Sequence, residues 1–131
     1  ADEVWMPRNE VFGWMWVLAG LLSGLALGTQ FHREDWLGGY ASHPRRLIRL
    51  GHISFLGLGF LNILFALGGA RMRLPPAMLA LASWALIAGG LSMPVCCALM
   101  AWKRELRLLF AVPVTSLVLG VALVVFGMLR P

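Results

Sequence analysis

The side chain best suited to chemistry is His52, which lies inside an apolar run at residues 47–70. An ionisable group within a membrane-length segment is a candidate functional site. Imidazole can ligate haem iron, the magnesium of a chlorophyll-type pigment, or another metal. We therefore expect His52 either to bind haem b or a chlorophyll-type pigment, or to be a neutral histidine bonded to a neighbouring Ser, Thr or carbonyl. A second haem ligand is harder to assign, because His32 lies at the membrane edge and residues 76–129 contain no histidine.

A second group of candidate ligands lies in the segment Met93-Pro-Val-Cys96-Cys97-Ala-Leu-Met100. Met93, Cys97 and Met100 are spaced to share one face of a helix. Thioether and thiolate sulfur suit Cu(I), so Cu(I) handling at Cys96 and Cys97 is one hypothesis. The alternative is that the two cysteines are small apolar residues and the methionines are core filler. Adjacent cysteines in a helix point about 100° apart, so we expect no structural disulfide.

Four apolar runs must position these residues, at 11–31, 47–70, 76–102 and 107–129. The hydrocarbon core of a bilayer is about 30 Å thick and needs roughly 20 helical residues to cross. A backbone in lipid must satisfy its own hydrogen bonds, so each run should be a helix. The sequence predicts an all-α integral membrane protein, one domain over residues 1–131, with an up-down-up-down bundle of four transmembrane helices. Their expected bounds are about 11–30, 45–68, 76–101 and 107–129.

Composition agrees with this class, since 60% of residues are hydrophobic, 13% are charged and the mean hydropathy is +0.79. The pI near 10.6 does not indicate nucleic acid, because the basic residues lie between apolar runs rather than on one soluble face. The first ten residues lack a positive n-region and a small-residue cleavage site, so we expect run one to be a retained helix.

The basic residues also predict orientation. The 32–46 and 103–106 connections with their flanking helix ends carry 7 of them, against 4 on the other side. The positive-inside rule places these connections in the cytoplasm and both termini on the non-cytoplasmic side, in a bacterial inner membrane. Basic and aromatic side chains there should contact lipid headgroups: Arg45, Arg46, Arg49, Lys103, Arg104, Trp36 and Trp102.

Small residues predict where helices approach closely. Gly20, Gly24 and Gly28 recur at four-residue spacing and form one groove, and Ser116 with Gly120 repeats the pattern near the C-terminus. Such grooves promote helix association by van der Waals contact in lipid. The pattern does not say whether the helix packed on Gly20, Gly24 and Gly28 belongs to this chain or to another subunit.

The function expected from these features is that of a non-catalytic accessory subunit in a larger membrane complex, of the electron-transfer or photosynthetic kind. Transporters usually keep a carboxylate or a broken helix at the midplane, and all six acidic residues here lie at ends or in loops. No nucleophile with a positioned base is visible. The expected partners are membrane lipids and other transmembrane subunits. The alternatives are a small redox protein with a cofactor on His52 and, less favoured, Cu(I) handling.

Overall fold

The structure is a computed structural model that describes residues 2–131, with side chains for residues 7–69 and 71–131. Four long helices account for most of it: α1 (Asp2–Gly28), α2 (His43–Gly68), α3 (Pro76–Trp102) and α4 (Ala111–Leu129). The described residues contain no strand. Four helical segments are long and apolar enough to cross a membrane, as the sequence predicts: Pro7–Gly28, His43–Gly68, Pro76–Trp102 and Arg104–Leu129.

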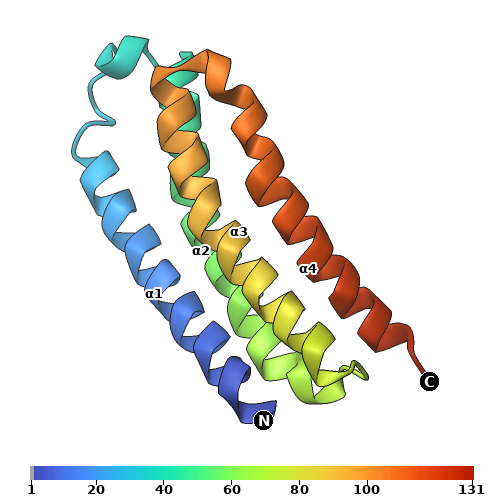
Figure 1. Ribbon diagram of the computed structural model, residues 1–131. Helices are drawn as coiled ribbons and strands as arrows, with labels where there is room; N and C mark the ends of the chain where they lie inside the picture. Colours follow the sequence, from blue (N-terminus) through green and yellow to red (C-terminus); the bar gives the residue numbers. More distant parts are fainter. Residues whose placement is uncertain (1) are drawn as a thin grey trace.

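The helices form an open arrangement in which α2 and α3 are central (Figure 1). Each helix packs mainly on the next along the chain, and α1 and α4 lie on opposite sides of the central pair. Half of the α3 span is buried, against 11% of the α1 and α4 spans. The outer helices therefore present most of their apolar surface to the surroundings.

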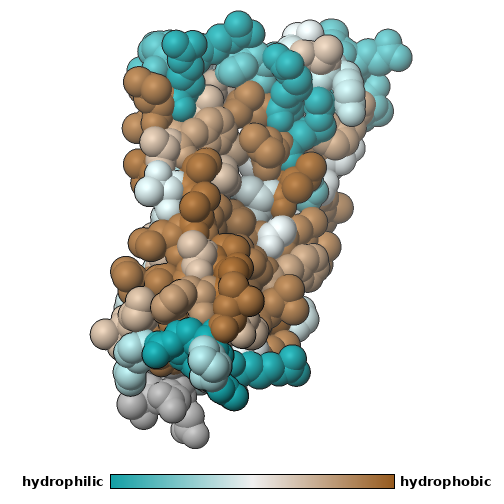
Figure 2. Space-filling model, turned by 90° about the vertical axis from the view of Figure 1, so that its right-hand side faces the viewer, coloured by the Kyte–Doolittle hydropathy of each residue, from teal (hydrophilic) through white to brown (hydrophobic). Residues whose placement is uncertain are grey.

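The two ends of the molecule differ in what they contain. Figure 1 shows both chain termini at one end, with the connection after α1 and the segment before α4 at the other. Figure 2 shows a predominantly hydrophobic middle on the face in view, with hydrophilic residues gathered at both ends. That distribution suits a molecule whose middle lies in hydrocarbon and whose ends reach the headgroups.

Helix boundaries follow local chemistry. Ser42 is the N-cap of α2, since its side chain accepts a hydrogen bond from the Arg45 backbone N–H at 3.3 Å. The expected boundaries of the first and last helices need correction. The first begins at Asp2 rather than near residue 11 and ends at Gly28. The last begins at Ala111, after a 3-10 segment η3 (Arg104–Phe110), which places Pro113 in the first turn where its missing N–H costs no hydrogen bond.

A polar network holds α1, α2 and α3 together near the end that carries the termini. Asn9, Asn62 and Ser83 come from these three helices, and all are 0% exposed. Asn9 Nδ2 donates to Asn62 Oδ1 at 2.8 Å and to the Ser83 carbonyl at 3.2 Å. The Ser83 hydroxyl donates to Asn9 Oδ1. Asn62 Nδ2 in turn donates to the backbone carbonyls of Leu58 and Leu86. Because every amide of the network has partners, three helices are fixed in rotation relative to one another.

Two further contacts extend this junction. The Arg8 guanidinium donates to Ser83 Oγ at 2.8 Å and lies 3.9 Å from the centre of the Trp84 ring. About two helical turns further along α1 than Arg8, Trp16 Nε1 donates to the Gly90 carbonyl at 2.7 Å. Together they continue the attachment of α1 to α3 beyond the network itself.

The fourth helix is attached by small residues and apolar packing. Ser116 Oγ donates to the Ala85 carbonyl at 2.7 Å, and a Cβ added to Gly120 would lie 2.8 Å from Leu86 Cδ2. The Ser116–Gly120 pair therefore faces α3. Next to it lies a core cluster drawn from α2, α3, α4 and the 69–75 connection: Phe65, Met72, Leu74, Leu79, Ala82, Leu86 and Leu123.

The network gives a test with a matched control on the same helix. Ser83→Ala leaves Asn9 Oδ1 without its donor, and we expect a loss of roughly 1–3 kcal/mol in the free energy of unfolding. Ser92 bonds only to carbonyls of its own helix, so Ser92→Ala should change that free energy by less than about 0.5 kcal/mol. Denaturation in mixed detergent micelles measures both. Equal losses for the two serines would contradict a structural role for the network.

Candidate functional site

His52 lies on the α1 side of α2, and its ring is held by one serine. The distance between His52 Nδ1 and Ser23 Oγ is 2.9 Å, and Ser23 Oγ also lies 2.9 Å from the Gly20 carbonyl oxygen. The Ser23 hydroxyl has one proton, which it can donate either to the Gly20 carbonyl or to Nδ1 of His52. The direction of the Ser23–His52 hydrogen bond therefore follows the tautomer of the imidazole.

The other ring nitrogen, His52 Nε2, has no hydrogen-bond partner among the described residues. Of the sequence alternatives for His52, the hydrogen bond to a neighbouring serine is therefore present, and Nε2 is the nitrogen that a ligand would use.

The glycine groove of α1 makes room for this ring. A Cβ added to Gly24 would lie 2.7 Å from His52 Cε1, and one added to Gly20 would lie 2.8 Å from Leu56 Cδ2. Both glycines therefore face α2 of the same chain. Gly28 differs, since a Cβ there would meet nothing within 4 Å. The structure uses Gly20 and Gly24 for packing within the chain and leaves Gly28 outside that contact.

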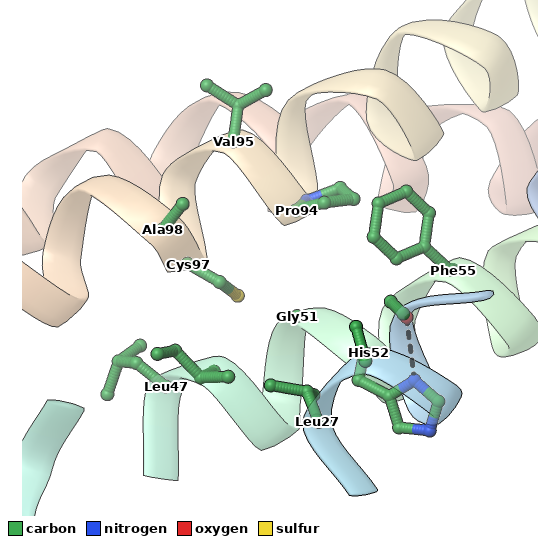
Figure 3. Close-up of a pocket in the computed structure, with 12 residues that line it drawn as sticks. Leu27, Leu47, Gly51, His52, Phe55, Pro94, Val95, Cys97 and Ala98 are labelled. Atoms are coloured by element: carbon green, nitrogen blue, oxygen red, sulfur yellow. Dashed lines mark hydrogen bonds between the residues drawn. The ribbon is translucent and has the colours of Figure 1, made fainter. Parts of the chain in front are cut away.

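Beside His52 is a pocket of about 410 Å³ whose walls come from α1, α2 and α3 (Figure 3). Apart from Ser23, His52 and Cys97, its walls are apolar: Ala26, Leu27, Leu47, Ile48, Gly51, Phe55, Pro94, Val95 and Ala98. Figure 3 shows the Cys97 sulfur directed into the pocket and the Nε2 side of the imidazole turned away from it. The pocket is large enough for one small ligand and mostly suited to hydrocarbon.

The sulfur residues of α3 do not converge. Cys96 Sγ lies 3.5 Å from the Leu109 carbonyl oxygen, whereas Cys97 faces the pocket. Met100 is buried, and its carbonyl accepts a hydrogen bond from His43 Nε2 at 2.7 Å, while Met93 does not line the pocket. No group of three or more His, Cys, Asp or Glu side chains comes together in the described part of the chain. The geometry gives the copper hypothesis no support.

His32 lies apart from this site. It is exposed in the connection between α1 and η1 (Trp36–Gly38) and does not line the pocket. The position of His32 therefore gives no support to the cofactor role considered for it.

The basic and aromatic residues of the connections divide into two groups. Arg46, Lys103, Arg104 and Trp102 are exposed, and Arg49 is half-buried with its guanidinium 3.8 Å from the Tyr40 ring centre. These residues are free to meet headgroups.

Arg45 differs from the expected headgroup contact and needs correction. It is 4% exposed and donates to the carbonyls of Phe31, Arg33 and Glu34 at 3.2–3.3 Å. Its guanidinium also lies 5.7 Å from the centre of the half-buried Trp36 ring. Because carbonyls in a loop without regular structure lack helical partners, a buried arginine satisfies them and closes the connection onto α2.

Sequence reasoning missed three residues that the structure makes central. Ser23 orients His52, and Asn9 and Ser83 complete the polar network. A signal existed for Ser23, because with the expected bounds of 11–30 and 45–68 it lies as many residues from the end of the first helix as His52 lies from the start of the second. Asn9 precedes the first apolar run and reads as a solvated residue, because that run gives no hint that the helix starts earlier.

Comparison with known proteins adds no further constraint. No protein-family model matches the chain, and no curated protein or solved structure is detectably similar to it. The assignment of a function therefore rests on the geometry alone.

The packing of His52 on Gly24 can be tested with a matched pair of substitutions. Gly24→Ala places a methyl group where the ring lies, so we expect it to displace the imidazole and break the bond to Ser23, with a loss of about 1–3 kcal/mol in stability. Gly28→Ala should be close to neutral. Nitrogen-15 NMR of the histidine side chains reports the tautomer. An unchanged His52 spectrum in Gly24→Ala would contradict the geometry.

Proposed function

We propose that this protein is a non-catalytic accessory subunit of a larger membrane complex, of the electron-transfer or photosynthetic class. The observation that carries the proposal is the open arrangement of the helices. Only 11% of the α1 and α4 spans is buried, and these two helices do not close on each other. Apolar faces on two opposite sides of one small chain suit a subunit that packs between other transmembrane helices.

The use of polar side chains within the spans supports the same proposal. Asn9, Asn62, Ser83 and Ser116 all bond to other helices of the chain. Such residues build a rigid scaffold with defined outer faces. A scaffold of this kind contributes by fixing the positions of its neighbours rather than by carrying out chemistry of its own.

Purification in a mild detergent tests the proposal. We expect the chain to elute as a stoichiometric complex with other transmembrane proteins. Val118→Trp and Leu22→Trp place a bulky ring on the exposed faces of α4 and α1, and we expect one of them to release the partner without unfolding the chain. Recovery of the unaltered chain as a stable monomer would contradict the proposal.

We also propose an orientation, with four antiparallel spans, both termini on the non-cytoplasmic side and the 32–46 and 103–106 connections in the cytoplasm of a bacterial inner membrane. The excess of basic residues at that end supports it. In a background of Cys96→Ala and Cys97→Ala, a membrane-impermeant maleimide added to intact cells should label Arg71→Cys but not Ala41→Cys. The reverse labelling would contradict the orientation.

A second candidate function is a small redox protein that holds a haem or chlorophyll-type pigment on His52. The specific observation in its favour is an imidazole within a span whose Nδ1 is hydrogen-bonded to Ser23 and whose Nε2 has no hydrogen-bond partner among the described residues. No second histidine lines the pocket beside His52. An absorption spectrum of the purified chain should then show a tetrapyrrole band that disappears in His52→Leu. A featureless visible spectrum from native membranes would remove this candidate.

A further inference from the structure

The arginine that extends the polar network carries a charge for which the described side chains supply no counter-ion. We infer that Arg8 binds the phosphate of an anionic phospholipid, such as phosphatidylglycerol, at the end of the molecule that carries the termini. The guanidinium donates hydrogen bonds to the phosphate oxygens, and the Trp84 ring lies against the glycerol part of the lipid. The inference depends neither on a protein partner nor on a cofactor at His52.

The Arg8 guanidinium is held in place but is not neutralised. Its Nη2 donates to Ser83 Oγ at 2.8 Å, and its Cζ lies 3.9 Å from the centre of the Trp84 ring. Both of these neighbours are uncharged. Arg8 is half-buried, and its Nε is buried with no hydrogen-bond partner among the described residues. Because a cation partly removed from water is unfavourable without an anion beside it, the site favours an anion from outside the chain.

The acidic side chains that the structure describes do not take the role of that anion. Glu10 is exposed and follows Arg8 by two residues, and residues two apart on a helix do not face each other. The other described acidic residues lie in the connections at the opposite end of the molecule: Glu34, Asp35 and Glu105. The charge of Arg8 is therefore left for a ligand.

The position of Arg8 along α1 indicates which anion it meets. Arg8 precedes the first apolar run at 11–31, near one of the two ends where hydrophilic residues gather (Figure 2). Trp84 is 54% exposed beside it, and exposed tryptophans are typical of the level of the lipid headgroups. Phosphate is the anion of that level. A guanidinium has five N–H groups in a planar fork that matches phosphate oxygens, and the bond to Ser83 uses one of them.

Arg8 differs from other arginines at the same end of the molecule. Arg71 and Arg73 are exposed in the 69–75 connection, where they keep their hydration and rotamer freedom. Arg8 is already ordered by Ser83 and Trp84, so it loses less conformational entropy when it binds a phosphate. Since Ser83 belongs to the polar network, a lipid bound at Arg8 also stabilises the packing of α1 on α3.

Native mass spectrometry of the full chain, freed of lipid in a non-ionic detergent, tests the inference. The probes are phosphatidylglycerol, a diacylglycerol with the same acyl chains, and inorganic phosphate. We expect phosphatidylglycerol to bind about ten- to hundredfold more tightly than diacylglycerol, the range expected for hydrogen bonds to a charged group. Arg8→Gln should reduce that preference to about twofold or less. The matched control Arg71→Gln removes the same charge from an exposed site and should leave the preference unchanged within about twofold.

Equal affinity of the unaltered chain for phosphatidylglycerol and diacylglycerol would overturn the inference, and so would equal effects of Arg8→Gln and Arg71→Gln. Inorganic phosphate that binds as tightly as phosphatidylglycerol would show that the site takes free phosphate rather than a lipid. A transmembrane protein that Arg8→Gln releases, without any lipid preference, would assign the counter-ion to a partner carboxylate. The comparison of the two lipids uses the unaltered chain, so it decides the matter even if a variant fails to fold.

Discussion

The structure depends on the free-energy cost of leaving a polar group without a hydrogen bond in hydrocarbon. That cost requires the backbone to be helical across each apolar run, and it applies equally to the few polar side chains within the spans. Asn9, Asn62 and Ser83 avoid this cost because they form hydrogen bonds with one another from three different helices. The rotation of α1, α2 and α3 is thereby fixed, and the remaining apolar packing is built around a defined polar junction.

The same constraint explains the site at the other end of the molecule. Ser23 lies within hydrogen-bond distance of both the Gly20 carbonyl and His52 Nδ1, and Gly24 leaves space for the ring. His52 Nε2 has no partner among the described residues, and it is turned away from the apolar pocket (Figure 3).

Much of the fold could be predicted from the sequence, because apolar length is a property of each segment alone. The four spans and the start of α3 at Pro76 are local features and appear where expected. The open arrangement was not predictable, since it depends on which faces meet. The early start of α1 was missed because its polar first residues, among them Asn9, are stabilised by distant partners.

His52 was recognisable by type, but Ser23 and the direction of Cys97 depend on tertiary contacts. Arg45 is a further example. Its charge suggested a contact with lipid headgroups, whereas in the folded chain its guanidinium donates to three backbone carbonyls.

Hydrogen–deuterium exchange of the full chain in lipid nanodiscs tests the central claim most directly. If four helices cross the bilayer around the Asn9–Asn62–Ser83 junction, backbone amides in the middle of all four spans should remain protected for hours, including those of the sparsely packed α4. Exchange within minutes across the middle of α2 or α4 would show that water reaches those backbones, and the account would fail.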